Sequence, residues 1–440
     1  MRFLLRAIRK ISRIFSHFLS QVAHQFARVE HKATRILLGV DYSVKIVNET
    51  TIEEKLYGAM PWITPINPSL PAVQRPPKVT LLIPSLVSRG FYGGAATALI
   101  FAARFALYKK LPLRIVQTNE PGDNSGLKEF FQTNDIGIDL QSVEIIDVSA
   151  RRFNVYGYLD LHPKDIFIAT AWWDARLIEQ LPLLQKFIYL IQDYEPIFYP
   201  NGDYSVLAEN TYHSQKFIPV CNTELMYEFM SEMGYSYIQE HGLWFEPAVS
   251  RVHSGLTQQN TGKQKIFLYG RPNVERNLFH LSLAALNQVF ADGGLNPNEW
   301  EIFMAGQDNI PDLRLSSGII IQNLGKMSME KYLTFSKTID LAISPMMAPH
   351  PNYPTLEFAS IGASVVTTKY KTKQSLTRYS PNIFMSDLSL DSLVSTIISA
   401  SKPTYLERMA GMKKNAIPDS WESQLTPLYK KISLNLPKSS

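Results

Sequence analysis

Short apolar runs and longer stretches of helical periodicity alternate along most of this chain, beginning near residue 79. The runs at residues 81–83 (LLI) and 266–269 (IFLY) are continuously apolar instead of alternating with polar residues. Such runs are expected of parallel strands that helices cover on both faces of a sheet. Strands and helices in alternation are typical of βαβ units, so the pattern predicts an α/β fold.

Twelve strands are predicted in this way, six in each half of the chain, and they imply two Rossmann-like, doubly wound parallel sheets. Two sheets agree with the length of 440 residues, which exceeds what one hydrophobic core normally organises. The predicted strands cover residues 79–84, 113–117, 143–148, 165–169, 187–191 and 216–220 in the first half, and 265–269, 301–305, 318–322, 339–344, 364–367 and 382–385 in the second.

The same pattern divides the chain into five parts. A polar stretch at residues 257–265, with little apolar pattern, lies between the two predicted sheets. The final helical stretch, Trp421 to Ile432, follows Pro418 and is expected to cross back to the first domain. The parts are a basic amphipathic helix (1–40), a proline-rich connector (41–78), an N-terminal domain (79–250), a C-terminal domain (251–415) and a C-terminal helix (416–440).

The first 40 residues combine an apolar face with a basic one. Leu4, Ile8, Ile11 and Phe15 follow the three-and-four spacing of a helix, and arginines follow it on roughly the opposite face. No apolar run here approaches the roughly 18 residues that would span a bilayer. Residues 1–36 are therefore predicted to lie on an anionic membrane surface. A helix packed on the protein, a homodimer contact and a presequence are the alternatives.

Charge and cysteine content narrow the function further. Eight of the 44 Lys and Arg residues lie in residues 1–40 beside one acid, which leaves 36 basic and 38 acidic side chains elsewhere. A nearly neutral folded part argues against nucleic acid as a partner. The single cysteine, Cys221, excludes an internal disulfide framework and a zinc site built from several cysteines. A cytoplasmic location, peripheral at the inner face of the cell membrane, agrees with these features.

Candidate chemistry lies in the loops that follow the predicted strands, because doubly wound folds bind ligands beyond the carboxyl ends of their strands. Gly93 and Gly94 follow the first strand and open a predicted helix. Glycines at a helix N-terminus let backbone N–H groups approach an anion. They indicate a phosphate contact or, alternatively, a tight turn with close helix packing.

Two arginines follow the first strand of the second half. Arg271 leaves the strand end and Arg276 comes five residues later. Guanidinium groups suit bidentate contact with a pyrophosphate, although a salt bridge to Glu275 or another surface acid is the alternative. Lys326 follows a later strand, in the sequence Asn323-Leu324-Gly325-Lys326.

A proline-rich loop follows the strand at residues 339–344. Its path is fixed by prolines, and a helix is expected to begin near Pro354, which suits a first helical position. Glu357 would then lie in the first turn, where a carboxylate either faces the helix dipole or accepts hydrogen bonds from ribose hydroxyl groups. His350 and Tyr353 lie in the same loop.

The first half offers aromatic and acidic candidates. Trp172, Trp173 and Tyr194 supply flat surfaces for sugar rings, or they are core aromatics. Asp193 and Glu195 flank Tyr194 after the strand at 187–191, and Asp174 follows the strand at 165–169. These carboxylates are candidates to orient or deprotonate an acceptor hydroxyl, and the alternative for Asp193 and Glu195 is capping the turn before Pro196.

In combination these residues resemble a known family. The second half is similar to the donor domain of glycosyltransferase family 4, which has an arginine after its first strand, a basic residue five positions on, a lysine two strands later and a glutamate opening a helix. The matching positions are Arg271, Arg276, Lys326 and Glu357. The resemblance implies a GT-B fold with two domains facing a central cleft. It also implies that Arg271 and Lys326 bind the donor pyrophosphate, Glu357 the ribose, and Gly93 and Gly94 the phosphates.

The sequence departs from that family at two points. Pro349 stands where the family usually has a second glutamate, so His350 or a backbone group would take over its contact with the sugar. The usual histidine of the first domain is also missing, because the equivalent loop reads Ala171-Trp172-Trp173-Asp174.

A closer resemblance is to the S-layer glycan rhamnosyltransferase subgroup. The similar stretches begin at Ala171, Ile191, Asn222, Tyr269 and Pro349, and the resemblance covers roughly residues 79–400. It implies a dTDP-L-rhamnose donor, a glycan or lipid-linked glycan acceptor that contains rhamnose, and neither a metal nor another cofactor. Retention of anomeric configuration is expected of family 4.

The sequence lacks the motifs of two other classes of protein. A nicotinamide-dependent enzyme would need a three-glycine turn with an acid about 20 residues on, and neither half has one. A hydrolase of the Gly-x-Ser-x-Gly type lacks its motif. The strongest alternative is a non-catalytic glycan-binding or assembly protein on the same scaffold, which would leave a nucleotide sugar intact.

Overall fold

The computed structural model describes residues 51–68, 74–86, 91, 93–153, 158–249 and 262–436. The chain separates into a unit of residues 1–56 and a compact unit of residues 57–440, and both predicted sheets belong to the second unit. The predicted basic helix at 1–40 and the predicted domain boundary at 250 lie outside the described residues. In its described part, the connector contains the helix α2 (Ile52–Ala59) and a short 3-10 helix at Pro61–Ile63.

The N-terminal domain is a seven-stranded, fully parallel sheet in the order β4-β3-β2-β6-β7-β8-β9. All six strands predicted for this half are confirmed, and the three-residue β9 was not predicted. The strands are β2 (Val79–Ile83), β3 (Leu113–Gln117), β4 (Glu144–Asp147), β6 (Ile166–Ala169), β7 (Phe187–Ile191), β8 (Phe217–Asn222) and β9 (Leu243–Phe245). A short parallel pair, β1 (Asn67–Pro68) and β5 (Tyr158–Leu159), lies apart from this sheet.

The C-terminal domain has a second seven-stranded sheet in the order β12-β13-β11-β10-β14-β15-β16. All six predicted strands are present, but the sheet is not entirely parallel, because β12 runs antiparallel to β13 through a tight turn with Gly318 at a φ of +89°. The strands are β10 (Gln264–Tyr269), β11 (Trp300–Ala305), β12 (Leu313–Arg314), β13 (Ile320–Asn323), β14 (Leu341–Ile343), β15 (Ser364–Thr368) and β16 (Ile383–Ser386).

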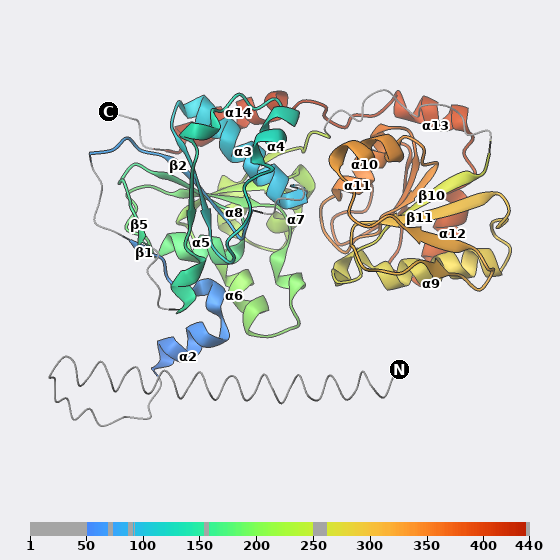
Figure 1. Cartoon of the computed structure of the whole chain (residues 1–440), viewed down its shortest axis with the longest axis horizontal. Helices are drawn as coiled ribbons and strands as arrows, with labels where there is room; N and C mark the ends of the chain where they lie inside the picture. The colour runs from blue at the N-terminus through green and yellow to red at the C-terminus, as the bar shows by residue number, and fades with distance from the viewer. Residues whose placement is uncertain are drawn as a thin grey trace. The chain divides into compact units, whose positions relative to one another are not determined.

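Helices connect the strands of each sheet (Figure 1). The N-terminal domain has α3 (Gly93–Lys109), α4 (Leu127–Thr133), α5 (Trp172–Glu179), α6 (Asp203–Thr211), α7 (Glu224–Glu232) and α8 (Ser236–His241). The C-terminal domain has α9 (Phe279–Ala291), α10 (Met329–Ser336), α11 (Tyr353–Ser360), α12 (Leu390–Ala400) and α13 (Tyr405–Met412). No helix in the described ranges combines the length and the apolar content that crossing a bilayer requires.

Both faces of each sheet are buried, which explains the continuous apolar runs. In β2, Leu81 and Ile83 pack into one core cluster while Leu82 packs into another. Neighbouring side chains of a strand point to opposite faces, so both positions must be apolar when helices cover both faces. The same holds in β10, where Ile266 and Leu268 share one cluster and Phe267 belongs to the other.

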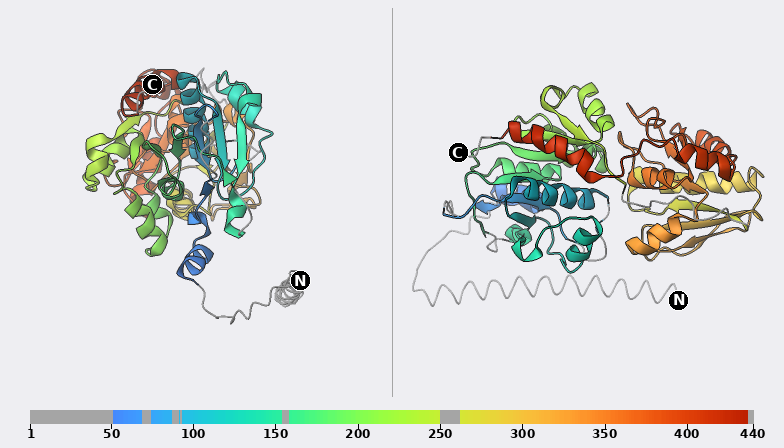
Figure 2. Two further views of the ribbon diagram at one scale, coloured as in Figure 1. Left: turned by 90° about the vertical axis from the view of Figure 1, so that its left-hand side faces the viewer. Right: turned by 90° about the horizontal axis from the view of Figure 1, so that it is seen from above.

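Helix α14 (Trp421–Leu434) belongs to the core of the N-terminal domain although it follows the C-terminal domain in sequence. Leu425, Leu428 and Ile432 are buried there, and the Tyr429 hydroxyl donates to the Phe101 carbonyl oxygen at 2.9 Å. Figures 1 and 2 show α14, in red, beside α3. The chain therefore crosses between its two sheets a second time before it ends.

Candidate functional site

The candidate residues of the C-terminal domain lie at the carboxyl ends of its parallel strands, where ligands of such folds bind. Arg271 follows β10, Lys326 follows β13, and the loop with His350 and Tyr353 follows β14. These strands are close neighbours, because β11, β10 and β14 are adjacent and β13 pairs with β11.

Arg271 and Lys326 lie on loops that touch each other. The Gly306 N–H, just after β11, donates to the Gly325 carbonyl oxygen at 3.1 Å, directly before Lys326. A Cβ atom at Gly306 would lie 3.0 Å from Cγ of Arg271, and the φ of Gly306 is +133°. Glycine at this position therefore lets the stem of Arg271 pass over the end of β11.

Both cations are exposed and uncompensated. Arg271 donates to the Tyr269 hydroxyl at 3.3 Å, and neither Arg271 nor Lys326 forms an ion pair with any residue that the structure describes. Two such cations on adjoining loops form a site for an anion with two charges. A diphosphate has this character.

Asp308 orders the loop that carries Lys326, a role that the sequence did not predict. Its carboxylate accepts a hydrogen bond from the Lys326 backbone N–H at 2.8 Å. Gly325 adopts a φ of +64°, and a Cβ there would lie 2.7 Å from Oδ1 of Asp308. Glycine at position 325 therefore allows the close approach of Asp308. Asp308 binds the backbone of Lys326 and does not form an ion pair with its ammonium group.

Asn352 builds the turn that leads into α11. Its amide donates to the Ser344 carbonyl oxygen at 2.9 Å, and its Oδ1 caps the helix by accepting from the Thr355 N–H at 2.8 Å. The helix begins at Tyr353, so Pro354 occupies the second helical position. The sequence had indicated the first position for Pro354. The asparagine cap moves the start one residue earlier.

Glu357 consequently lies beyond the first turn of α11, which corrects the prediction from sequence. Its half-buried carboxylate accepts a hydrogen bond from the Tyr332 hydroxyl at 2.8 Å. Burial raises the pKa of Glu357 although this hydroxyl opposes the shift. Tyr332 thus holds one oxygen and leaves the other without a hydrogen-bond donor among the described residues, as a ribose ligand would require.

Arg276 does not pair with Glu275 but lies against an acid of the N-terminal domain. Its Nε is 3.0 Å from Oδ2 of Asp193, and its guanidinium carbon is 4.2 Å from the centre of the Phe198 ring. Nε2 of His350 lies 3.4 Å from the same Asp193 oxygen. Asp193, Arg276 and His350 therefore form one polar cluster.

The electrostatics of this cluster favour an ionised Asp193. Asp193 is only 7% exposed. Burial raises the pKa of Asp193, but His350, Arg276 and the Tyr194 N–H outweigh burial and hold the pKa below its usual value. A carboxylate in this state orients cations well and is a weak proton acceptor.

Tyr353 connects α11 with the end of the N-terminal sheet. Its hydroxyl is hydrogen-bonded to the Thr97 hydroxyl of α3 and accepts from the Asn222 amide at 3.4 Å. Burial raises the pKa of Tyr353 to about 12, so the phenol is neutral. Asn222 was not proposed from the sequence as a site residue, although it opens one of the stretches that resemble the rhamnosyltransferase subgroup and lies at a strand end.

Gly93 and Gly94 form the first turn of α3. Gly93 has a φ of +54°, in the left-handed region that glycine adopts without penalty. The Gln192 amide donates to the Gly94 carbonyl oxygen at 3.0 Å. The turn is therefore braced by the β7 loop that also carries Asp193.

Asp174 and Glu195 are buried below this edge with their oxygens occupied. Asp174 accepts hydrogen bonds from the hydroxyl groups of Thr118 and Thr170, at 3.0 and 3.1 Å. Glu195 accepts from the Trp172 N–H at 3.0 Å and from the Tyr189 hydroxyl at 2.6 Å. Burial raises the pKa of Asp174 to about 6 and that of Glu195 to about 8, although these donors oppose the shifts.

The three aromatic candidates differ in exposure. Trp172 is fully buried and its Nε1 donates to the Tyr199 hydroxyl at 3.0 Å, while the ring of Tyr194 packs 5.0 Å from that of Phe229. Trp173 is half-buried, 5.7 Å from the ring of Trp62 in the connector. Trp173 is thus the candidate ring with surface left for a ligand.

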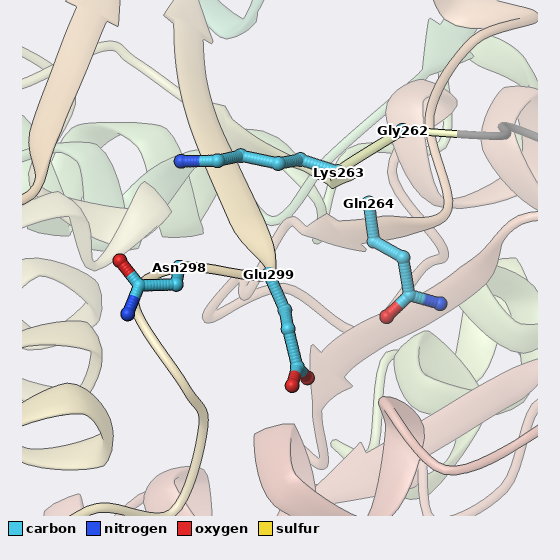
Figure 3. Close-up of a pocket in the computed structure, with 5 residues that line it drawn as sticks. All are labelled: Gly262, Lys263, Gln264, Asn298 and Glu299. Carbon is cyan, nitrogen blue, oxygen red and sulfur yellow. The ribbon is translucent and has the colours of Figure 1, made fainter.

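Two surface cavities lie in the C-terminal domain. One of about 370 Å³ is at the amino ends of β10 and β11, where Lys263 points away from Gln264 and Glu299 (Figure 3). That edge is opposite to Arg271 and has no convergent polar groups. A second, of about 750 Å³, follows α10 and is lined by Lys326, Leu324, Met327 and Phe335 among others. Within the described ranges, no group of three or more His, Cys, Asp or Glu side chains could hold a metal ion.

The chain is similar to proteins of cell-surface polysaccharide synthesis. It is 30% identical over 269 residues to the O-antigen biosynthesis protein RfbC of Myxococcus xanthus, a match that covers 60% of this chain. The chain spans about a fifth of the length of that relative, because the match covers 20% of it.

Solved GT-B glycosyltransferases share the fold. A TarM mutant of S. aureus, crystallised with fondaparinux, alpha-GlcNAc-glycerol and UDP, superposes with a TM-score of 0.58 at 9% identity, over 82% of this chain and 100% of TarM. Alr3699/HepE of Anabaena, in complex with UDP-glucose, gives a TM-score of 0.53 at 13% identity, over 82% of this chain and 99% of HepE. The predicted GT-B fold is thus confirmed.

Two family models match the two domains in order. The model of the WsaF N-terminal domain matches residues 78–224, and that of the WsaF C-terminal domain matches residues 264–398. The first match contains Gly93, Gly94 and Asp193, and the second contains Arg271, Lys326 and Glu357. Together the matches cover more than half of the chain, and it belongs to the WsaF family that these two domains define.

Proposed function

We propose that this protein is a glycosyltransferase that transfers L-rhamnose from dTDP-L-rhamnose to a growing cell-surface glycan. The observation that carries the proposal is the pair of exposed, uncompensated cations, Arg271 and Lys326, on adjoining loops at the carboxyl edge of the C-terminal sheet. A departing nucleoside diphosphate develops negative charge, and fixed cations stabilise it without a metal ion. RfbC, named for O-antigen biosynthesis, and the WsaF family support the substrate class.

Glu357, the glycines of α3 and His350 have donor-side roles in this proposal. One carboxylate oxygen of Glu357 accepts a hydrogen bond from a ribose hydroxyl group, while the Tyr332 hydroxyl donates to the other oxygen. The first turn of α3, at Gly93 and Gly94, faces the phosphates with its N–H groups. His350 contacts the sugar in place of the glutamate that Pro349 replaces.

The acceptor side relies on fewer groups than the sequence indicated. Trp173 offers a partly exposed ring for a sugar, whereas Trp172 and Tyr194 support it from the core. Asp193 orients Arg276 and His350, and Asp174 and Glu195 maintain the loops around it. The pKa of Asp193 is held below its usual value, so Asp193 suits an orienting role more than proton removal. This agrees with the retention expected of family 4, which usually proceeds without an identifiable protein nucleophile.

Location and assembly complete the proposal. Residues 1–36 hold the enzyme at the inner face of the cell membrane, close to a lipid-linked acceptor, and a homodimer is an alternative use of the same segment. Deleting residues 1–36 is expected to release the protein from anionic liposomes and leave nucleotide affinity unchanged. Liposome binding that survives the deletion would disprove the membrane role.

The first experiment is a binding screen by calorimetry and thermal shift with dTDP, UDP, GDP, NAD and dTDP-L-rhamnose, because a ligand of the native state raises its apparent stability. UDP is included because TarM was crystallised with UDP and HepE with UDP-glucose. We expect dTDP and dTDP-L-rhamnose to bind, and Arg271→Ala and Glu357→Ala to weaken them. If UDP alone binds, the proposed donor changes from a dTDP-sugar to a UDP-sugar. If no nucleotide binds, the transferase proposal is wrong.

One observation favours a second candidate, a glycan-binding protein on the same scaffold. Pro349 stands where a related glycosyltransferase would have a carboxylate that contacts the donor sugar. Incubation with dTDP-L-rhamnose and a rhamnose-containing acceptor separates the two functions. Release of dTDP with a lengthened glycan identifies a transferase, while glycan binding with intact nucleotide sugar identifies the binding protein.

A further inference from the structure

Lys373 is a buried cation that none of the sequence motifs includes. It lies in the connection between β15 and β16, where Tyr370 and Lys373 exchange backbone hydrogen bonds of 3.0 and 2.8 Å. Lys371, at the tip of this turn, has a φ of +47°. The turn fixes the direction of the Lys373 backbone, and the Lys373 side chain is 0% exposed.

The ammonium of Lys373 joins the two ends of the loop that precedes α11. Its Nζ donates to the Met346 carbonyl oxygen at 3.1 Å and to the His350 carbonyl oxygen at 3.4 Å. Between these two residues, the Met347 N–H donates to the Arg276 carbonyl oxygen at 2.8 Å. One buried cation therefore closes a five-residue loop, and the loop in turn holds the segment that carries Arg276.

This contact requires a charged or strongly polar group. Burial lowers the pKa of Lys373 to about 7, although the charge of Asp193 opposes the shift. No carboxylate among the described residues forms a salt bridge with Lys373. An apolar side chain of similar length would fill the space without the cost of desolvating an ammonium. It would also leave the His350 carbonyl oxygen without the donor it has here, whereas the Met346 carbonyl oxygen would keep its hydrogen bonds from the Ala348 N–H and the Thr368 hydroxyl.

We infer that Lys373 is a positioning residue of the donor site: its ammonium closes the 346–350 loop and so holds His350 and Arg276 against Asp193, ready for a nucleotide sugar. The inference rests on the proposed function, because the loop lies at the edge where the donor diphosphate and sugar would bind. The groups around Lys373 are the Met346 and His350 carbonyl oxygens and the Asp193 carboxylate with its Arg276 and His350 partners. The Tyr370 phenol interacts with the same carboxylate.

Loss of the proton from Lys373 leaves an amine that still has two N–H groups but is a weaker donor than an ammonium, so it should loosen the loop and weaken donor binding. The test measures the dissociation constant of dTDP by calorimetry from pH 6 to pH 9 for the full chain and for Lys373→Met and Lys373→Arg. Lys369→Met is the matched control, since Lys369 lies four residues away and pairs with Asp387 at the surface.

We expect the parent and the Lys369→Met control to lose about tenfold in affinity for dTDP across this pH range. A change of this size corresponds to a shift of about one unit in the pKa of one group. Lys373→Arg keeps its charge and should show a flatter profile, while Lys373→Met should bind weakly at every pH. Parent-like affinity with a parent-like pH profile in Lys373→Met would overturn the inference.

Ligand-free unfolding separates this inference from the proposed function. Because the folded pKa of Lys373 lies below its ordinary 10.5, the unfolded chain binds more protons between pH 7 and pH 10. The midpoint of thermal unfolding should therefore gain from this group as pH rises through that window, and Lys373→Met should lack the gain. A parent that binds no nucleotide would overturn both the donor site and the donor role of Lys373. The unfolding profile would still show whether Lys373 is the group that titrates.

Discussion

The carboxyl edges of the two sheets use charged side chains in opposite ways. In the C-terminal domain, Arg271 and Lys326 are exposed and no described acid pairs with them. In the N-terminal domain, Asp174 and Glu195 are buried and each accepts two hydrogen bonds from neighbouring donors. Exposed cations retain their charge for a ligand, whereas buried acids with occupied oxygens are committed to the protein itself.

This difference indicates that the C-terminal domain, and not the N-terminal domain, is suited to bind an anion. The C-terminal edge is electropositive before any ligand arrives, so it needs little rearrangement to receive a diphosphate. At the N-terminal edge, most of the acidic and aromatic candidates are buried. Asp193 is its exception, because it is held ionised by Arg276 and His350.

The amino edge of the N-terminal sheet provides a second contrast. There Asp165 is 0% exposed and paired with Arg75 at 2.6 Å and with the fully buried Arg114 at 3.1 Å. Burial raises the pKa of Asp165, but Arg75, the His162 and Lys78 N–H groups and Arg114 outweigh burial and lower it. Asp165 is therefore a buried acid that is compensated by cations, unlike Glu195.

The largest effect is expected from Asp165→Ala, which breaks this compensated cluster. It leaves Arg75 and Arg114 paired with Asp160, which is partly exposed, and takes away their fully buried acid. Removing one member of a buried ion pair costs about 3–5 kcal/mol of unfolding free energy. Chemical denaturation followed by circular dichroism measures the loss. Glu144→Ala is the control, because the Lys78–Glu144 pair is partly exposed and such pairs contribute at most about 1 kcal/mol. Equal losses in the two variants would contradict the contrast.

The next effect concerns the exposed cations. Lys326→Ala and Arg271→Ala should each weaken dTDP binding by about 1.5–3 kcal/mol, the worth of a hydrogen bond to a charged group. Neither variant should change unfolding, because neither side chain forms an ion pair with the described residues. Calorimetry at low and high salt measures both the loss and its screening.

Matched controls lie at the opposite edge of the same sheet. Lys263 is exposed just before β10, and Arg314 is exposed at the end of β12, opposite Ile320 at the amino end of β13. Lys263→Ala and Arg314→Ala change the net charge by the same amount, so unchanged binding in them would assign the effect to the carboxyl edge. A loss equal to that of Lys326→Ala would mean that dTDP responds only to overall charge.

The fold was predictable because βαβ units repeat a strong pattern. Every predicted strand is present, since covering both faces of a sheet forces continuous apolar runs such as residues 266–269. The antiparallel β12 was missed because two residues carry no periodicity. The start of α11 was misplaced by one residue because the Asn352 cap depends on its hydrogen bond to Ser344.

The site was predictable only in part. Position after a strand indicated Arg271 and Lys326, because topology alone brings strand ends together. The pairing of Arg276 with Asp193, 83 positions away in sequence, depends on how the loops meet, and no local pattern encodes it. Likewise, an isolated lysine such as Lys373 looks like a surface residue until its burial is known.

A smaller effect is expected from Glu195→Gln. Burial raises the pKa of Glu195 to about 8, so the carboxyl is largely protonated at pH 7 and glutamine resembles it. The folded state binds more protons than the unfolded state between pH 4.5 and 8, so this group's contribution to stability falls as pH rises through that window. Thermal unfolding from pH 5 to pH 8 should show a flatter slope for the variant, with transfer activity at pH 7 nearly unchanged. A large loss of activity would give Glu195 a catalytic role.

The smallest effect on stability tests whether the N-terminal edge also contacts the anion. A Cβ at Gly94 would meet the Gln192 amide at 3.4 Å, an ordinary contact, so Gly94→Ala should alter unfolding by less than about 1 kcal/mol. Gly93 has space for a Cβ but a φ of +54°, so Gly93→Ala should cost about 1–2 kcal/mol through backbone strain.

Binding of dTDP distinguishes packing from recognition at this turn. If phosphates approach the N–H groups of α3, the added methyl of Gly94→Ala should weaken dTDP binding while unfolding stays unchanged. Unchanged affinity would restrict the anion site to Arg271 and Lys326. The contrast between the two edges would then be complete, with the C-terminal domain alone binding the diphosphate and the N-terminal domain serving the acceptor.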